Sequence, residues 1–322
     1  MRPLKIFDCF PFYNEYDLLR LRMACLQDVV DGFVAVEAYQ THAGKPKPLF
    51  LSKEGPADLR AHPKLSVHAV DLPVGFSDWA RDQYQREAIG DALRVLGAAA
   101  EDVVLVSDVD EIPTVDAVHR ARDALRGVPE RRLLIFEQRL FYFRLNYELV
   151  WSRKMPWLGT AAARFGDARS INGMRTTGRN TRGRHAKDFD KQARVFRLPE
   201  GGWHFSYLGG DEFLRQKLLA HEEHSAKRRQ ARSVRELIDG RLSLFPRKGM
   251  EEVWAVVEPA AVGLPPGAIE RAGVAPLFHS PCDSSADILR RVREASVPRR
   301  WRLGRFDIGY LRRSPWPRLP DH

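Results

Sequence analysis

The sequence has few cysteines and no long hydrophobic run. Its three cysteines, Cys9, Cys25 and Cys282, form neither a CxxC pair nor the framework of a disulfide-rich fold. No window approaches about 18 uncharged apolar residues, so we expect no membrane-spanning helix. Asp8 interrupts the only apolar stretch of the first 15 residues, and no small-residue cleavage site follows, which argues against a secretory signal. These absences predict a protein of a reducing, cytoplasmic compartment.

The composition is that of a globular protein. Apolar residues make up 44% and charged residues 29% of the 322 residues, which excludes disordered and collagen-like classes. The charge is uneven: residues 1–126 hold 15 Lys or Arg against 20 Asp or Glu, and residues 127–322 hold 37 against 22. The second half therefore suits an anionic partner, although solvated arginines explain the excess equally well.

The first half of the chain alternates apolar runs with helical periodicity. We expect strands at residues 5–10, 32–38, 65–70 and 102–107, and helices at residues 15–25, 78–96 and 114–125. Apolar strands separated by helices are typical of parallel sheets with both faces covered. The pattern predicts an α/β fold with a Rossmann-like, mostly parallel sheet covered by helices.

The second half is less regular. We expect strands at residues 133–137, 141–145 and 203–208, helices at 211–221 and 287–295, and a loop-rich basic insertion at 164–197. The predicted organisation is an α/β half (1–126), the second half of the same domain (127–283) and a basic tail (284–322). Because residues 290–318 contain ten arginines against two acids, we expect this tail to contact an anionic membrane, at the periphery of the inner membrane.

The strongest local motif is Ser107-Asp108-Val109-Asp110-Glu111, directly after an apolar strand. In an extended turn, residues two apart point the same way, so Asp108 and Asp110 would offer two oxygen ligands suited to magnesium or manganese. The motif lies at the carboxyl edge of the predicted sheet, where open α/β folds bind ligands. The alternative, that the two aspartates only cap the next helix, carries equal weight.

A second cluster, Gly201–Gly210, brackets His204 with glycines and aromatic residues. Glycine is favoured where backbone turns tightly or approaches a ligand. Taken alone, His204 is either a core histidine or a ligand.

Five segments in order resemble glycosyltransferase family 17, the family of the β-1,4-mannosyl-glycoprotein 4-β-N-acetylglucosaminyltransferases. They are Phe7–Glu15, Val36–Leu49, Trp79–Arg86, Ser107–Pro113 and Gly202–Tyr207, within a resemblance that covers residues 4–245. The resemblance implies a GT-A fold, inversion at the anomeric carbon, a divalent metal (manganese or magnesium) and a nucleotide-sugar donor, which is UDP-GlcNAc in the animal members. Residues 1–126 would then form the nucleotide-sugar-binding half.

The resemblance and the charge pattern together give the candidate site. The metal ligands would be Asp108, Asp110 and His204. The donor-binding residues would be Pro11, Asn14, Glu15, Glu37, Lys45, Arg81, Gln85, Arg86, Asp108 and, as a point charge for phosphate, Lys217. Salt bridges to Asp78, Asp82 or Glu87 on the same helix are an alternative role for Arg81 and Arg86.

Inversion also needs a carboxylate base at the acceptor. Glu212, which starts the helix after Gly209-Gly210, is the candidate, and Asp211 is the second; helix capping is the alternative for both. The acceptor would be a glycan, a glycoprotein or a lipid-linked molecule.

Two other interpretations stay open. A haloacid-dehalogenase-type phosphatase would use Asp108 as nucleophile and Asp110 as acid/base. It would, however, carry this motif on its first strand and need a later acidic pair. A nucleic-acid-binding protein would use the basic half. That interpretation leaves the acidic motif unexplained, so we expect no nucleic-acid partner.

Overall fold

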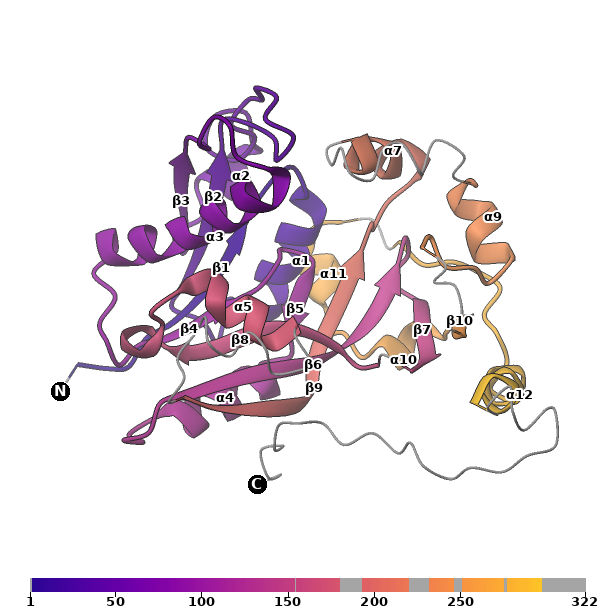
Figure 1. Ribbon diagram of the computed structural model, residues 1–322. Coiled ribbons are helices and arrows are strands. Elements are labelled where there is room, and N and C mark those ends of the chain that lie inside the picture. Colours follow the sequence, from indigo (N-terminus) through magenta and orange to yellow (C-terminus); the bar gives the residue numbers. More distant parts are fainter. Residues whose placement is uncertain are drawn as a thin grey trace.

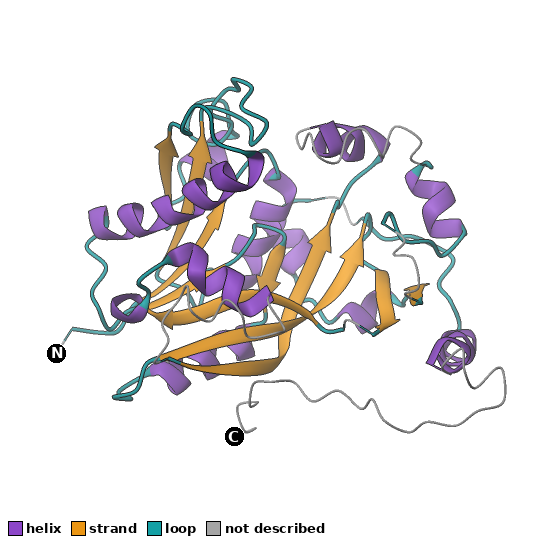
Figure 2. Ribbon diagram, viewed as in Figure 1, coloured by secondary structure: helices purple, strands orange, loops and turns teal. Residues whose placement is uncertain are grey.

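Figures 1 and 2 show the computed structural model, in which helices lie on both faces of a central sheet. The structure describes residues 2–153, 155–179, 193–219, 232–245, 251–274 and 277–296. Within these residues the main path of the sheet follows the order β10-β7-β6-β8-β4-β1-β2-β3, and β9 pairs with β5 and β6. No helix in this described part is long and apolar enough to cross a membrane.

The first half forms the parallel part of the sheet. Strands β1 (Ile6–Pro11), β2 (Gly32–Ala38), β3 (Leu65–Val70) and β4 (Val103–Val106) pair in parallel in the order β4-β1-β2-β3. The connecting helices are α1 (Tyr16–Leu26), α2 (Ala57–Arg60) and α3 (Asp78–Val95), and α4 (Val115–Leu125) follows the short strand β5 (Glu111–Pro113). The predicted α/β class and its helix-covered sheet are confirmed.

Alternation along β1 separates two cores. Ile6 and Phe10 belong to the core that contains residues of α1 and α4, whereas Phe7 and Cys9 belong to the core that contains residues of α3 and α5 (Ile171–Arg179). The strand is therefore apolar on both sides, as parallel strands covered by helices are. The charged Asp8 lies on the α1 side, and it sets up the candidate site.

The second half extends the same sheet with mixed pairing. Its strands are β6 (Arg132–Tyr142), β7 (Tyr147–Ser152), β8 (Trp157–Arg164), β9 (Arg194–Ser206) and β10 (Glu252–Val256). β8 runs antiparallel to β4 and to β6, while β9 runs parallel to β6. Because β8 pairs with β4, residues on both sides of position 126 share one sheet.

Smaller helices complete the second half. A third core joins β6, β7 and β10 to α7 (Asp211–Leu219) and α9 (Val234–Asp239). The other helices of the described residues are α10 (Pro259–Val262), α11 (Ala268–Ala272) and α12 (Ser285–Ser296). The predicted basic tail lies outside the described residues beyond Ser296.

Two sequence expectations for the second half are wrong. A separate strand at 141–145 is absent from the described chain, because β6 continues to Tyr142 and residues 143–146 form the turn to β7. The expected loop-rich insertion at 164–197 contains a short 3-10 helix (Phe165–Asp167), α5 and the start of β9, while residues 180–192 lie outside the described part. The helical period of α5 is hard to recognise because two of its buried positions, Arg175 and Thr177, are polar.

Gly202 generates a stability prediction, because it lies where β9 pairs with β5. Its φ is +133°, and a Cβ there would meet the carbonyl oxygen of Ile112 at 2.1 Å. We expect Gly202→Ala to lower the free energy of unfolding by about 2 kcal/mol or more, measured by urea unfolding, because strained backbone alone costs about 1–3 kcal/mol.

The matched control is Gly210→Ala, where a Cβ meets no atom within 4 Å. We expect a change below about 1 kcal/mol. Equal losses in the two variants would contradict a specific steric role for Gly202.

Candidate active site

The segment Ser107–Glu111 after β4 forms a turn rich in carboxylates, called the acidic turn below. A buried ion pair lies beneath it. Asp8 on β1 and Arg22 on α1 have no exposed side-chain surface, and Arg22 Nε and Nη2 donate to the two Asp8 carboxylate oxygens at 2.7 and 2.5 Å. Nη2 also donates to Ser107 Oγ at 2.6 Å. Nη1 donates to the backbone carbonyls of the turn, those of Asp108, Val109 and Glu111, at 3.1, 3.2 and 2.8 Å. One guanidinium therefore fixes the backbone of the turn.

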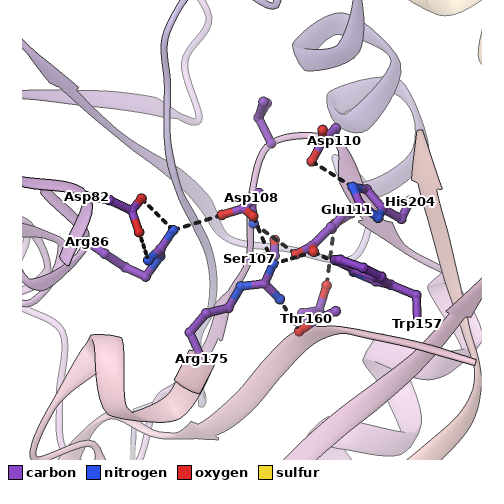
Figure 3. A network of polar contacts seen from close by, with 12 residues as sticks. Asp82, Arg86, Ser107, Asp108, Asp110, Glu111, Trp157, Thr160, Arg175 and His204 are labelled. Atoms are coloured by element: carbon purple, nitrogen blue, oxygen red, sulfur yellow. Dashed lines mark hydrogen bonds and ion pairs between the residues drawn. The ribbon is translucent and has the colours of Figure 1, made fainter. Parts of the chain in front are cut away.

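Asp108 is held by two further arginines, as Figure 3 shows. Arg86 Nη2 on α3 donates to Asp108 Oδ1 at 3.0 Å, and Arg175 Nη2 on α5 donates to Oδ2 at 2.9 Å. Arg86 also forms a two-bond pair with Asp82 at 2.8 and 2.9 Å. The same-helix salt bridge considered for Arg86 is thus present, together with the contact to the acidic motif.

Glu111 holds the acidic turn from its buried side. Its buried carboxylate accepts hydrogen bonds from Trp157 Nε1 at 2.7 Å and from the Asp108 backbone N–H at 3.0 Å, and it pairs with Arg175. Its backbone pairs with His204 of β9. Glu111 thereby joins the acidic turn to the second half of the sheet.

Asp110 faces a different set of partners. Its Oδ1 lies 3.5 Å from His204 Nε2, and its Oδ2 lies 3.4 Å from Lys217 Nζ on α7. Lys217 Nζ also lies 3.3 Å from Glu15 Oε1. Burial alone would raise the pKa of Asp110, but Lys217 and His204 outweigh it and lower that pKa to about 2. Burial alone would lower the pKa of Lys217, but Asp110 and Glu15 raise it.

The hydrogen bonds and ion pairs described for the two aspartates run to different residues. The guanidiniums of Arg86 and Arg175 hold Asp108, whereas Asp110 is directed toward His204. Within the described residues no group of three or more His, Cys, Asp or Glu could hold a metal ion.

Asp110 and His204 nevertheless form a two-residue donor set of suitable chemistry for a divalent cation. A carboxylate oxygen and an imidazole nitrogen are ligands that manganese accepts. His204 Nδ1 is buried without a hydrogen-bond partner, whereas Nε2 faces the Asp110 carboxylate, which only accepts when ionised and so favours a proton on Nε2. The residues fit a metal whose remaining ligands come from outside the protein, such as diphosphate oxygens and water.

Most of the residues predicted to bind the nucleotide-sugar donor lie in the first half of the chain. Glu15 accepts hydrogen bonds from the backbone N–H groups of Tyr13 and Asn14, just after Pro11 at the end of β1. Lys217 links Glu15 to Asp110, because its Nζ lies close to both carboxylates. Arg86 and Lys217 thus contact the acidic motif, and Asn14 and Glu15 lie in the turn that precedes α1.

The other residues predicted to bind the nucleotide-sugar donor lie in or contact β2 and the loop that follows it. Glu37 is buried and accepts from the backbone N–H groups of Leu51 and Ser52 at 2.9 and 2.8 Å. Gln85 Nε2 donates to the Val36 carbonyl, and Arg81 Nη1 donates to the His42 carbonyl, both at 2.8 Å. Arg81 also lies 3.8 Å from Asp78, and the exposed Lys45 belongs to the same loop. Their contacts within the protein shape this loop.

The two candidate bases are not brought to the acidic turn by any hydrogen bond or ion pair of the described residues. Asp211 Oδ1 accepts from the Val234 backbone N–H at 2.6 Å and so ties α7 to α9. The Glu212 side chain is 72% exposed and contacts Arg215 and Gln216 on its own helix.

The structure adds residues that the sequence interpretation missed. They are Asp8, Arg22, Trp157 and Arg175. Asp8 carried a readable signal, since a charge inside an apolar strand needs a buried partner. Trp157 and Arg175 come from distant segments, and no local pattern marks them.

A sequence comparison decides the family. The model of glycosyltransferase family 17 matches residues 1–165 of the 322. The chain belongs to glycosyltransferase family 17. Relatives of this family 17 chain include the β-1,4-mannosyl-glycoprotein 4-β-N-acetylglucosaminyltransferases of Rattus norvegicus and Homo sapiens, each 32% identical over 123 residues. That match covers 36% of this chain and 23% of each relative, so the chain matches less than a quarter of their length.

A solved structure is also similar at low level. A crystal structure of an active-site mutant of LgtC covers 92% of this chain and 98% of its own, with a TM-score of 0.30 and 10% identity. Similarity this low carries no argument about the site.

The ion pair beneath the turn of this family 17 chain generates a prediction. Arg22→Met leaves the Asp8 carboxylate buried without its cation, so we expect the free energy of unfolding to fall by about 3–5 kcal/mol. Urea unfolding and the soluble yield measure the effect.

Arg20→Met is the matched control. Arg20 lies on the same helix as Arg22, but its partner is Asp58 of α2, whose side chain is exposed. We expect a change below about 1 kcal/mol. If the two variants were equally stable, the buried pair would not be what holds the turn.

Proposed function

We propose that the chain transfers a sugar from a nucleotide-sugar donor, GlcNAc from UDP-GlcNAc, to a hydroxyl of a glycan or glycoconjugate, with inversion and with a divalent metal. The observation that carries the proposal is the pairing of Asp110 with His204 beside Lys217, at the carboxyl end of β4. Open α/β sheets bind ligands at this edge. Membership of a glycosyltransferase family supports the reaction class, and the names of the relatives support the donor sugar.

The chemistry of the residues fits this reaction. Cleavage of a sugar-phosphate bond leaves a nucleoside diphosphate, and positive charge must stabilise it. Asp110 and His204 would hold the metal, which supplies that charge when bound. Lys217 adds an ammonium group at the same point, between Asp110 and Glu15. Asp108, held by Arg86 and Arg175, is the other aspartate of the acidic motif.

The catalytic base is a separate part of the proposal. Glu212 is the better candidate, because its exposed carboxylate contacts only residues of its own helix in the hydrogen bonds described. Asp211 already accepts the Val234 N–H. Both residues lie on α7, the helix whose Lys217 contacts Asp110.

The acceptor is a glycan, a glycoprotein or a lipid-linked molecule. The basic second half supports an anionic acceptor or surface. The cytoplasmic location and the contact of the basic tail with an anionic membrane stay predictions. Sedimentation with anionic but not neutral liposomes, lost in high salt, would test the membrane contact.

The primary test is a donor screen that follows release of nucleoside diphosphate in manganese. We expect release from UDP-GlcNAc, and we expect Asp110→Asn to reduce it by about 100-fold or more, because a charge-holding ligand is lost. His204→Ala should raise the manganese concentration for half-activation by about 10- to 100-fold. Asp116→Asn, an exposed acid on α4, is the control that keeps full activity.

The proposal fails if none of the nucleotide sugars is cleaved, or if Asp110→Asn turns over at the wild-type rate. Release of phosphate from a phosphomonoester panel, dependent on Asp108, would favour the phosphatase instead.

The base is tested with acceptor present. Glu212→Gln keeps the shape of the side chain and removes its basicity, so we expect transfer to fall by about 100-fold with manganese and UDP binding unchanged. Asp211→Asn is the paired variant. If Asp211→Asn loses transfer while Glu212→Gln keeps it, the base is Asp211; activity in both variants would exclude both residues.

A further inference from the structure

Arg175 is a buried cation that connects three separate segments at the acidic turn. Its side chain is 1% exposed. Nη1 donates to the carbonyl of Gly159 on β8, while Nη2 donates both to Asp108 Oδ2, at 2.9 Å, and to Glu111. The helix that carries Arg175, α5, packs against β8 and α3. Arg175 therefore has both a scaffold contact and a contact to the motif.

The three acids of the turn differ in exposure. The side chain of Glu111 is fully buried and that of Asp110 is 9% exposed, whereas that of Asp108 is 30% exposed. Asp108 is thus held from the protein side by two guanidiniums and is open on another side. A carboxylate held by both oxygens has little freedom to rotate.

The shared nitrogen of Arg175 couples Asp108 to a rigid part of the protein. Glu111 is fixed by Trp157 and by the backbone of Asp108. Because one Nη2 contacts both carboxylates, the orientation of Asp108 follows that of Glu111. The planar guanidinium can hold these contacts while its other nitrogen binds Gly159, and a lysine ammonium has no such fork.

We propose that Arg175 is a positioning residue for the donor site: it holds Asp108 Oδ2 in the one orientation in which the acidic turn binds a divalent cation together with a nucleoside diphosphate. The inference rests on the proposed function and deepens it. Arg175 touches neither donor nor acceptor and acts through Asp108. A purely structural Arg175 would instead be needed only to neutralise Glu111.

The variant Arg175→Lys separates these two roles. Lysine keeps a positive charge beside Glu111 but loses the fork that spans Asp108, Glu111 and Gly159. Arg164→Lys is the matched control: Arg164 also binds a carboxylate, Asp167, at 2.7 Å and donates to the Val128 and Glu130 carbonyls. It lies opposite Val103, at the other end of β4.

Three quantities are measured for wild type and both variants: the thermal midpoint, binding of manganese in the presence of UDP by electron paramagnetic resonance of the free ion, and release of UDP from UDP-GlcNAc. We expect the thermal midpoint of Arg175→Lys to stay close to that of Arg164→Lys. We expect manganese affinity and turnover of Arg175→Lys to fall by about 10-fold or more, and those of Arg164→Lys to stay unchanged.

The inference is overturned if Arg175→Lys binds manganese and UDP as the wild type does, or if wild type binds no manganese with UDP. It is also overturned if the losses in Arg175→Lys only follow a fall in its thermal midpoint. Should wild type release no nucleoside diphosphate while Arg175→Lys alone weakens manganese binding, the transfer reaction would be refuted and the positioning role would stand.

Discussion

The ion pair between Asp8 and Arg22 is the interaction on which the candidate site depends. Two charges without exposed side-chain surface are costly unless their hydrogen-bonding capacity is used. Arg22 meets this condition, because all three of its guanidinium nitrogens donate, to Asp8, to Ser107 Oγ and to the carbonyls of the turn. The carboxylate of Asp8 on β1 thus helps, through Arg22, to hold the acidic motif that follows the neighbouring strand β4.

The same physical principle recurs around the turn. Asp108, Asp110 and Glu111 would repel one another if they stood alone. Each is instead matched by cations from separate elements: Arg86 from α3, Arg175 from α5 and Lys217 from α7. All three cations are anchored by further contacts, Lys217 by Glu15. A metal bound at Asp110 would share that carboxylate with Lys217.

The sequence predicted the first half of the molecule well because its information there is local. Apolar runs marked the strands β1 to β4, and helical spacing marked the helices α1, α3 and α4. The acidic motif at the end of β4 could be recognised without any distant residue. The failures at residues 141–145 and 164–197 have a different origin. The end of β6 and the following turn are set by pairing with β7 and β9, and α5 buries an arginine whose carboxylate partners lie more than sixty positions earlier. His204 stays a predicted ligand; the structure places its ring beside Asp110, and which carboxylate it faces depends on strand register.

The pairing of β5 with β9 decides which residue of the second half lies beside the acidic turn. Glu111 and His204 lie opposite one another although about ninety positions of the chain separate them, so a slip of β9 by one residue would turn His204 to the other face of the sheet. The match to the family model ends at residue 165, before Arg175, His204 and Lys217. The acidic turn therefore lies within the matched segment, whereas three of the side chains that contact it come from the chain beyond that segment.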